Sequence, residues 1–470
     1  MALLHPLRGA GRGRRDHRRR DPGGRLLLTG SRTDNPQLRQ RDILRFWLPL
    51  AGTWMMMAVE GPLLASVIAR LAEPRYNLAA FGVAFAVAVI VEAPVIMMLG
   101  ASTALVDGRE TFLRLRQFTH WLNLGTTAAM LLVVLTPLYR PIFEGLIGLD
   151  PHVADLTRGA LMILLPWPAA IGYRRFHQGL LIRRGSPRRV AYGTVVRLLT
   201  MLSAVVAFYN LTSIAGAYLG AAALTIAVCT EAVVARWMAR HEVRRLTAHD
   251  AEAGSATSYG KIWQFYLPLA WTSVVAMAAQ PLVTFFMGRA PRPLDSLAVL
   301  PVINALTFLF RSLGLAYQEV IITMLARDPS YRRPVLRFAL TLGLSASIGL
   351  ALIVATPFSR VWFQTLSGLD ESLYRFALLP AWILIPIPAL SVLLSVQRAF
   401  LMHQRYTRPI TWATVIEIAG IAGLLALLIR TTPWVGAVAA AIAFVGGRLA
   451  GNLTLVGPLR AVRGRSQSSG

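Results

Sequence analysis

Leu48-Pro49-Leu50-Ala51 recurs as Leu267-Pro268-Leu269-Ala270, at an offset of 219 residues (267 − 48). The flanking residues keep this register. They are Phe46, Thr53, Pro62-Leu63 and Arg70 in the first copy, and Phe265, Thr272, Pro281-Leu282 and Arg289 in the second. A second block, Gly148-Leu149-Asp150, recurs as Gly368-Leu369-Asp370, at an offset of 220 residues (368 − 148). The chain therefore contains two homologous halves that follow each other in the same direction.

Both halves are strongly apolar. Of the 470 residues, 55% are hydrophobic and 15% are charged, against ~25% charged residues in soluble domains. Apolar runs of about 20 residues, long enough to cross the ~30 Å hydrocarbon core of a bilayer, fill most of the chain. Such spans must be helices, because a backbone in lipid has to satisfy its own hydrogen bonds. We predict an all-α polytopic membrane protein with about 12 transmembrane helices, at residues 43–69, 77–104, 118–138, 158–182, 190–210, 213–238, 262–288, 295–325, 335–357, 373–401, 408–430 and 434–457.

The repeat and the apolar runs together define the organisation of the chain. Each half holds six predicted spans, and an even number inserts both halves the same way round, as parallel repeats related by an axis along the membrane normal. The expected segments are a basic, disordered cytoplasmic tail (1–40), the N-terminal half (41–240), a flexible cytoplasmic linker (241–258), the C-terminal half (259–460) and a cytoplasmic tail (461–470).

The net charge of +26 comes from arginine, since Lys261 is the only lysine. A soluble protein this basic would suggest nucleic acid as a partner. Here the arginines gather in alternate loops, at residues 109–116, 183–189, 236–245, 327–333 and 405–408, and the positive-inside rule places such loops in the cytoplasm. We expect a multi-pass protein of the cell membrane with both termini cytoplasmic, the bilayer as partner and no nucleic acid. The arginine bias and the lack of a secretory or organellar signal favour a bacterial inner membrane.

Prolines inside the predicted spans indicate kinks. Pro62 and its repeat mate Pro281 lie deep in the first helix of each half, where a proline frees the carbonyl group one turn earlier. Pro94 takes a similar place in the second helix. We predict that Pro62, Pro94 and Pro281 are kink or gating positions; the alternative is a fixed curvature without motion.

The Gly-Leu-Asp triplets that end at Asp150 and Asp370 follow short segments beginning with Thr-Pro. Aspartate is favoured at the N-cap of a helix because its side chain accepts a hydrogen bond from a free backbone N–H group. We therefore predict turns at the outer face, with Asp150 and Asp370 capping the helices that follow.

Two six-helix halves that each open with Leu-Pro-Leu-Ala resemble the superfamily of the multidrug and toxic compound extrusion (MATE) transporters and the polysaccharide flippases (MOP superfamily). Within it, Pro49-Leu50 followed by Glu60, together with the aromatic opening of the second half, is similar to the progressive ankylosis protein family. The superfamily resemblance implies a V-shaped bundle with a central cavity and alternating access. The narrower resemblance implies export of small anions, although the long basic tail departs from that family's pattern.

Ionisable residues inside the predicted spans mark candidate functional sites, because such groups are costly in lipid and usually face a cavity or a partner. We assign Glu60 and Glu92 to binding of a coupling cation, either a proton or sodium. Arg311 falls on Glu92 at the repeat offset, and its guanidinium suits an anionic group of the substrate. The structural alternative is that Glu92 and Arg311 pair with each other, or that each pairs within its own half. The predicted substrate-binding residues are Arg311, Glu319 and Glu417.

These residues favour a transporter over an enzyme. The chain lacks the phosphate-binding loop of ATP-driven proteins and the common hydrolase motifs, so we expect no catalytic residues, no metal site and no cofactor other than an ion gradient. The leading prediction is a monomeric secondary transporter that exports a small, anionic organic or phosphate-bearing solute. The alternatives are a multidrug efflux antiporter, a lipid-linked oligosaccharide flippase and, outside transport, an intramembrane lipid-modifying enzyme.

Overall fold

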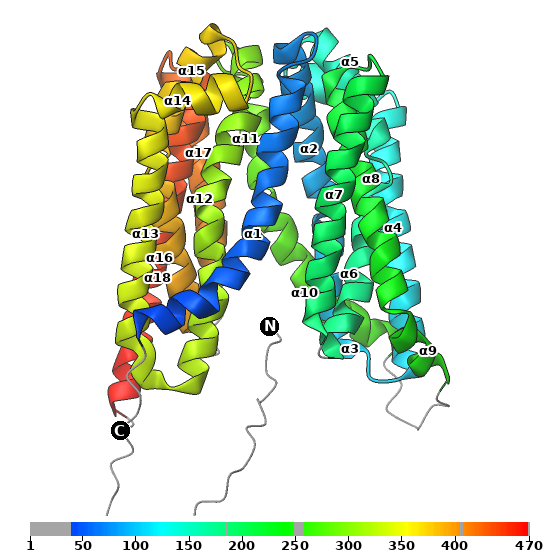
Figure 1. The fold of residues 1–470 in the computed structure, drawn as a ribbon, viewed down its shortest axis with the longest axis vertical. Coiled ribbons are helices and arrows are strands. Elements are labelled where there is room, and N and C mark those ends of the chain that lie inside the picture. The colour runs from blue at the N-terminus through cyan, green and yellow to red at the C-terminus, as the bar shows by residue number, and fades with distance from the viewer. Residues whose placement is uncertain (1–38, 185, 249–257, 405, 407, 469–470) are drawn as a thin grey trace, which may run out of the picture.

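The computed structural model describes residues 39–184, 186–248, 258–404, 406 and 408–468, and all regular secondary structure in these ranges is helical. The predicted tail at 1–40 lies outside the described residues apart from its last two positions, as do residues 249–257 of the predicted linker and 469–470 at the C-terminal end. Figure 1 shows a bundle of long helices that run between two ends of the molecule.

The N-terminal half contains eight principal helices and one short π-helical segment. They are α1 (Gln40–Ile68), α2 (Pro74–Ile96), α3 (Met98–Leu105), α4 (Arg109–Leu135), η1 (Pro141–Leu146), α5 (Pro151–Ile163), α6 (Trp167–Arg183), α7 (Pro187–Leu211) and α8 (Gly216–Met238). α9 (Arg240–Ala248) follows at the end of this half, so the predicted linker at 241–258 begins with a helix.

The C-terminal half repeats this order. It contains α10 (Tyr259–Met277), α11 (Ala279–Met287), α12 (Pro293–Arg327), η2 (Pro329–Tyr331), α13 (Arg332–Ala355), α14 (Phe358–Arg360), η3 (Val361–Leu366), α15 (Glu371–Ile383), α16 (Ile387–His403), α17 (Arg408–Thr431) and α18 (Gly436–Ser468). The π-helical segments η1 and η3 occupy matching places, and α18 runs on into the predicted C-terminal tail.

The described helices confirm the predicted membrane architecture. Eleven helical stretches are long and apolar enough to cross a bilayer. The stretch from α5 to α6 (residues 151–183) takes the place of a twelfth span, because its repeat mate, Glu371–His403, is one of the eleven. Its apolar character is interrupted by arginines at positions 158, 174 and 175. About 12 transmembrane helices in two six-helix repeats is therefore consistent with the structure.

The two halves stand side by side and diverge toward the end at which α1 begins and α18 ends (Figure 1), which gives the bundle the predicted V shape. The first helix of each half crosses to the other half: α1 packs along α12, and α10 packs along α2. Trp47 of α1 donates a hydrogen bond from Nε1 to the carbonyl oxygen of Leu313 at 3.2 Å. Tyr266, its repeat mate in α10, donates its hydroxyl hydrogen to the carbonyl oxygen of Pro94, the repeat mate of Leu313. Each half thus donates an equivalent hydrogen bond to the other half.

The predicted kink positions coincide with irregular helices. The helix formed by α10 and α11 is interrupted at Ala278, one turn before Pro281, where proline removes a hydrogen bond to the carbonyl of Met277. α2 contains Pro94 and ends two residues after it, before α3 begins. α1 contains Pro62 as well as Pro49 and is bent in Figure 1. Whether these positions move during function stays a prediction.

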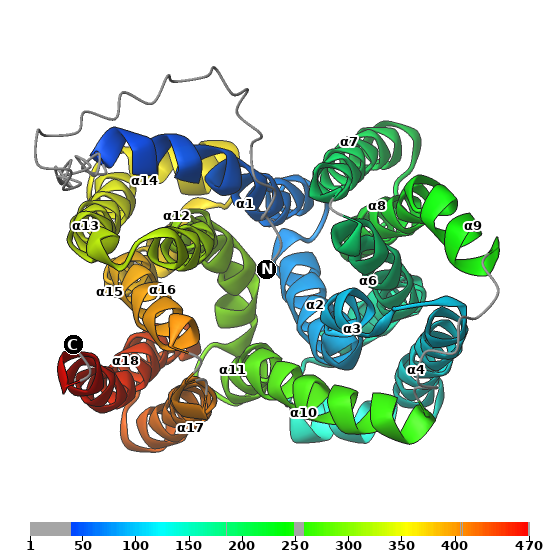
Figure 2. The same ribbon diagram turned by 90° about the horizontal axis from the view of Figure 1, so that it is seen from below.

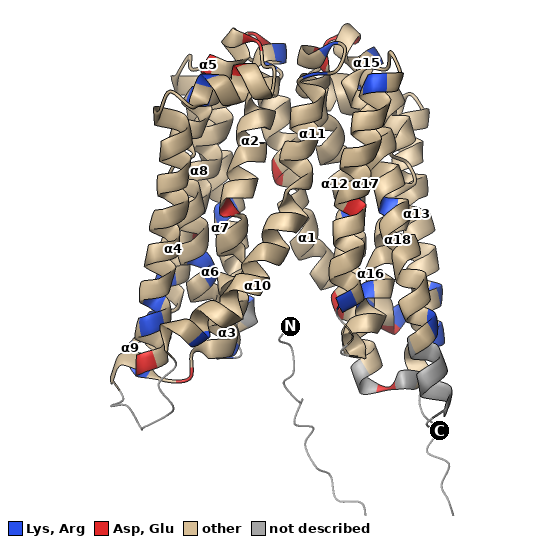
Figure 3. Ribbon diagram, turned by 180° about the vertical axis from the view of Figure 1, so that it is seen from behind, with Lys and Arg blue, Asp and Glu red and all other residues tan. Residues whose placement is uncertain are grey.

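The repeated Gly-Leu-Asp triplets form turns at the end opposite the chain termini, and both aspartates cap helices as predicted. Asp150 accepts a hydrogen bond from His152 N–H at 2.9 Å at the start of α5, and Asp370 accepts one from Leu373 N–H at 2.7 Å at the start of α15. Gly148 and Gly368 have φ angles of 81° and 72°, a conformation that glycine adopts without strain. The arginine-rich loops, in contrast, gather at the end that holds the termini (Figure 3).

Candidate functional site

A buried ion pair joins the first helix to the fifth span of the N-terminal half. Glu60 lies in the middle of α1, and Arg197 lies in α7. The Arg197 guanidinium donates from Nη2 and Nε to Oε1 of Glu60 at 2.6 Å and 2.9 Å. The two side chains are 14% and 11% exposed, so both charges lie largely within the protein. Glu60 therefore carries a counter-ion in this conformation, supplied by its own half.

The pair continues into a network of four helices. Glu231 of α8 is 1% exposed and lies 3.6 Å from Nε of Arg197, measured to Oε2. Arg174 of α6 forms a salt bridge with the same carboxylate, and Gln178 donates to its Oε1 at 3.1 Å. Two arginines and two glutamates thus compensate one another, which is how charges persist in a low-dielectric interior. We call Glu60, Arg174, Arg197 and Glu231 the N-terminal ion network.

Glu92 lies apart from that network. It is 7% exposed in α2, and Nε1 of Trp167, at the start of α6, donates a hydrogen bond to its Oε2. No arginine among the described residues forms a salt bridge with it. A carboxylate held by one neutral donor has lone pairs left for a cation or a proton, whereas the carboxylate of Glu60 is occupied by Arg197.

The C-terminal half has a smaller set of charges. Glu417 of α17 forms an ion pair with Arg448 of α18, with 2.9 Å between Oε1 and Nη2. Nη2 of Arg398, in α16, donates to the hydroxyl of Thr414 at 3.0 Å. Arg311 of α12 stacks over the ring of Phe308, with its guanidinium carbon 5.4 Å from the ring centre. It forms no salt bridge within the described part of the chain.

The repeat places opposite charges at equivalent positions. Glu92 corresponds to Arg311, and Arg197 corresponds to Glu417 at the offset of 220 (417 − 197). In the first half, Arg197 of the fifth span therefore faces a glutamate of the sixth span. In the second half, Glu417 of the fifth span faces an arginine of the sixth span. Duplication preserved the fold but gave the two halves complementary chemistry. The predicted division of labour between a cation site and an anion site stays a prediction.

The structure does not bring all the predicted site residues together. Glu92 and Arg311 do not pair with each other in this conformation; Glu92 is held by Trp167 and Arg311 stacks on Phe308, each within its own half. Glu319 is exposed on α12, while Glu417 is 9% exposed and held by Arg448. Arg448 and Glu231 are members of largely buried ion pairs.

Sequence reasoning missed Arg197, Trp167 and Gln178. Arg197 was detectable, because it is a lone charge within the apolar run 190–210 and such residues are functional candidates. Trp167 and Gln178 carried no signal of their own, since their importance comes from neighbours more than fifty residues away along the chain. Among the described residues, no three histidine, cysteine, aspartate or glutamate side chains gather in a way that could hold a metal ion.

A second set of contacts holds the halves together at the end opposite the termini. Arg70, after α1, donates from Nη1 to the carbonyl oxygen of Leu366 at 2.9 Å and also reaches the carbonyl of Thr365. Arg289, its repeat mate after α11, donates to the carbonyl oxygen of Gly145 at 3.4 Å. Gly145 is the repeat mate of Thr365. The arginine of each half thus binds the π-helical segment of the other half, and these contacts hold this end closed.

Arg75 adds an ion pair at the same end. It lies in the first turn of α2, and its Nη2 is 3.1 Å from Oδ2 of Asp370 in the other half; its Nη1 is 3.5 Å from Asp295. Partial burial acts to raise the pKa of Asp370. The hydrogen bonds from Leu373 N–H and Arg75 outweigh it and hold that pKa below the ordinary value. We call Arg70, Arg75, Arg289 and Asp370 the end clasp.

Solved structures share this architecture. A multidrug resistance MATE family transporter of the MOP superfamily, in an inward-facing conformation, matches with a TM-score of 0.64 at 13% identity, over 92% of this chain and 100% of that one. The lipid II flippase MurJ in an inward closed conformation matches with a TM-score of 0.65 at 13% identity, over 87% of each chain. A MOP superfamily transporter from Pyrococcus furiosus, whose binding pocket is described as having reverse polarity, matches with a TM-score of 0.58 at 16% identity, over 90% of this chain and 96% of that one.

These likenesses concern the fold. No protein-family model and no curated protein matches the sequence. The chain shares the fold of these MATE and MOP superfamily structures, which confirms the predicted V-shaped, all-α architecture. The structures compared are described as MATE or MOP superfamily transporters and a lipid II flippase. The narrower resemblance to the progressive ankylosis family stays a prediction.

Proposed function

We propose that this protein is a secondary active transporter that exports a small organic or phosphate-bearing solute by cation-coupled alternating access. The observation that carries the proposal is the asymmetry between the two ends of the bundle. The end clasp joins the halves at one end, and the helices diverge toward the other (Figure 1). Alternating access requires such a state and its mirror, in which the clasp opens and the other end closes.

The coupling would act through α1. This helix carries Glu60, extends along α12 of the other half and ends beside Arg70 of the clasp. In the present state Arg197 neutralises Glu60. Rocking of the halves would shift α1 relative to α7, and a proton or sodium ion would then replace Arg197 as the counter-ion of Glu60. Glu92, which already lacks an arginine partner, offers a second carboxylate for the same ion.

The substrate would be anionic because of Arg311. This guanidinium lies on α12, which packs against both α1 and α2 at the contact between the halves, and it carries no carboxylate partner among the described residues. Guanidinium groups bind carboxylate and phosphate in a bidentate way. By the positive-inside rule the arginine-rich end, and with it both termini, would face the cytoplasm, so that the present conformation faces inward.

The test compares the medium around cells that express the protein with the medium around cells that express Glu60→Gln. Glu110→Gln is the matched control, because Glu110 pairs with its helix neighbour Arg114 at the surface, away from the N-terminal ion network. A small anion that accumulates with the intact protein and the control, but not with Glu60→Gln, supports export and names the substrate. Its uptake into proteoliposomes under an imposed proton or sodium gradient then identifies the coupling ion. Identical media for all three proteins would contradict small-solute export and favour a lipid-linked substrate.

A further inference from the structure

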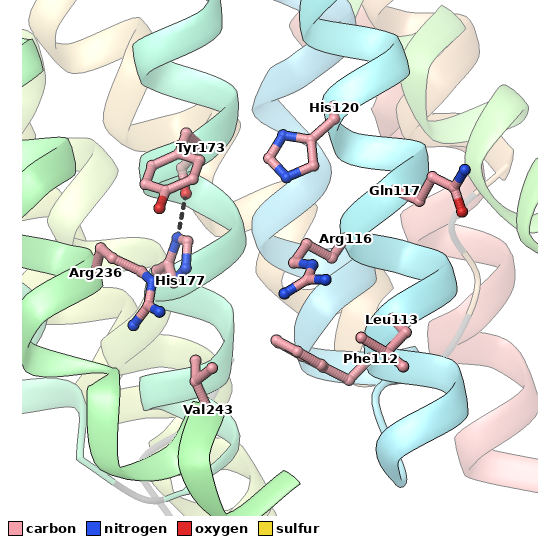
Figure 4. Close-up of a pocket in the computed structure, with 9 residues that line it drawn as sticks. All are labelled: Phe112, Leu113, Arg116, Gln117, His120, Tyr173, His177, Arg236 and Val243. Carbon is pink, nitrogen blue, oxygen red and sulfur yellow. Dashed lines mark hydrogen bonds between the residues drawn. The ribbon is translucent and has the colours of Figure 1, made fainter. Parts of the chain in front are cut away.

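A cavity of about 540 Å³ lies inside the N-terminal half, between α4, α6, α8 and α9. Figure 4 shows Arg116 and His120 of α4 facing Tyr173 and His177 of α6, with Arg236 of α8 beside them. The lining includes no member of the N-terminal ion network or of the end clasp. Figure 2 places α8 and α9 on the side of this half that faces away from the C-terminal half, and α4 beside α10. The lining residue Gln117 accepts a hydrogen bond from the hydroxyl of Tyr259 in α10 at 2.7 Å, so the cavity borders the first helix of the other half.

The charge of the cavity lining is positive and uncompensated. Two arginines and two histidines line it, and no carboxylate does. Neither Arg116 nor Arg236 forms a salt bridge with any residue that the structure describes. Nearby arginines do: Arg114 pairs with Glu110, and Arg184 pairs with Glu242 of α9. These two arginines have carboxylate partners, whereas Arg116 and Arg236 have none among the described residues.

Aromatic rings hold the polar groups in place. The guanidinium of Arg116 lies 5.5 Å from the ring centre of Phe112, a cation–π contact that positions the charge without neutralising it. His177 is 2% exposed, and its Nδ1 is 2.8 Å from the carbonyl oxygen of Tyr173, which fixes the ring and leaves Nε2 without a partner among the described residues. The ring of Tyr173 lies 4.4 Å from that of His177 and 6.3 Å from that of His120. The basic groups are thus arranged around one space.

The cavity lies toward the end of the bundle that holds the termini. Arg236 is in the last turn of α8, and Arg116 and His120 are in the N-terminal half of α4. Trp237 is 60% exposed next to Arg236, and Trp121 is 63% exposed next to His120. Tryptophans that face outward in this way mark the boundary between hydrocarbon and water. Val243 of α9, a helix rich in arginine, closes the cavity on the side toward the termini.

We propose that this cavity binds a phosphate-bearing anion. Guanidinium groups are donors that match phosphate oxygens, and basic pockets between membrane helices at this depth accommodate phosphorylated headgroups. The anion is the headgroup of an anionic phospholipid that enters from the side of α4 and α8, or a soluble phosphate compound with the same chemistry. A bound phosphate would neutralise Arg116 and Arg236 and join α4 to α8.

The test uses the full chain, purified and reconstituted in nanodiscs of phosphatidylcholine with or without phosphatidylglycerol. Native mass spectrometry counts the phosphatidylglycerol molecules that remain bound to the protein. The test variant is Arg116→Gln with Arg236→Gln. The control is Arg188→Gln with Arg337→Gln, which removes the same charge from two exposed arginines at the same end of the molecule. His120→Gln, on the exposed face of α4, is a milder second variant should the double variant fold poorly. A second arm measures binding of inorganic pyrophosphate in phosphatidylcholine nanodiscs.

The expected result is about tenfold weaker retention of phosphatidylglycerol by the test variant, equivalent to about 1.4 kcal/mol, with retention by the control unchanged. The intact protein could instead bind pyrophosphate without preferring phosphatidylglycerol, and the test variant could lose that binding. This result would support the proposal with a soluble phosphate compound as the ligand. Equal binding of both ligands by the intact protein, the test variant and the control would overturn it.

Discussion

Gly82 of α2 and Pro301 of α12 occupy the same position in the two repeats, at the offset of 219 (301 − 82), and they lie against each other. A Cβ atom placed on Gly82 would lie 2.9 Å from Cγ of Pro301. A residue that touches its own repeat mate marks the pseudo-two-fold axis between the halves. The axis therefore passes through the crossing of α2 and α12, and the absence of a side chain at Gly82 sets how closely these helices approach.

A larger residue at position 82 should act as a wedge between the halves. We expect Gly82→Leu to lower the free energy of unfolding by about 1–3 kcal/mol, the usual cost of overpacking a close contact, and to lower transport. Gly125→Leu is the control, since nothing lies within 4 Å of a Cβ atom at Gly125 in α4. Thermal unfolding in detergent measures the stability of both variants. An equal melting temperature for the two would show that α2 and α12 are not tightly packed at the axis.

The end clasp should control access to the end opposite the termini. We expect Arg70→Ala with Arg289→Ala to raise the reactivity of a cysteine placed at Thr365 toward a membrane-impermeant maleimide, because the hydrogen bonds that these two arginines make across this end are lost. The reporter is built in a Cys229→Ser background, which removes the single native cysteine.

Arg430→Ala serves as the control for this experiment. Arg430 lies in the last turn of α17 at the same end and forms no ion pair among the described residues. The clasp has no gating role if both proteins label at the rate of the background protein. It also has none if the control labels as fast as the double variant.

The sequence was sufficient to predict the fold because its signals are periodic and local. The offset between Leu48 and Leu267 reveals the duplication, and the length of the apolar runs reveals the spans. The Gly-Leu-Asp triplets predicted the caps at Asp150 and Asp370, since a cap depends only on residues close in sequence.

The candidate site was harder to predict, because its parts are distant along the chain. Glu60 was found from its depth in the membrane, but nothing local shows that Arg197, 137 residues away, is its partner. Depth alone likewise does not separate a charge in a buried pair, such as Glu231, from one near the membrane surface. Partner choice depends on how helices pack, and short apolar motifs do not specify that.

Replacing only one residue of the ion pair between Glu60 and Arg197 should destabilise the folded protein. Arg197→Gln leaves Glu60 without its counter-ion and Glu231 with Arg174 alone, so we expect a loss of about 3 kcal/mol in the free energy of unfolding. Adding Glu60→Gln removes the unpaired charge and should restore part of that loss. Unfolding of the two single variants and the double variant forms a double-mutant cycle. Additive effects would mean that the two residues do not interact in the folded protein.

The pair formed by Arg75 and Asp370 should make the closed end sensitive to acid. The pKa of Asp370 lies below its unfolded value of about 3.9, so the stabilisation is complete above that pH and is lost as the pH falls through the folded pKa. Asp370 is 46% exposed, so the contribution is less than about 1 kcal/mol. We expect Asp370→Asn, which retains an N-cap residue, to melt below the intact protein at neutral pH, and the difference to shrink as the pH falls below about 3.9. Asp150→Asn is the control, because Asp150 caps α5 without an arginine partner among the described residues. A difference in melting temperature that persists unchanged at about pH 3 would show that charge on Asp370 does not hold this end together.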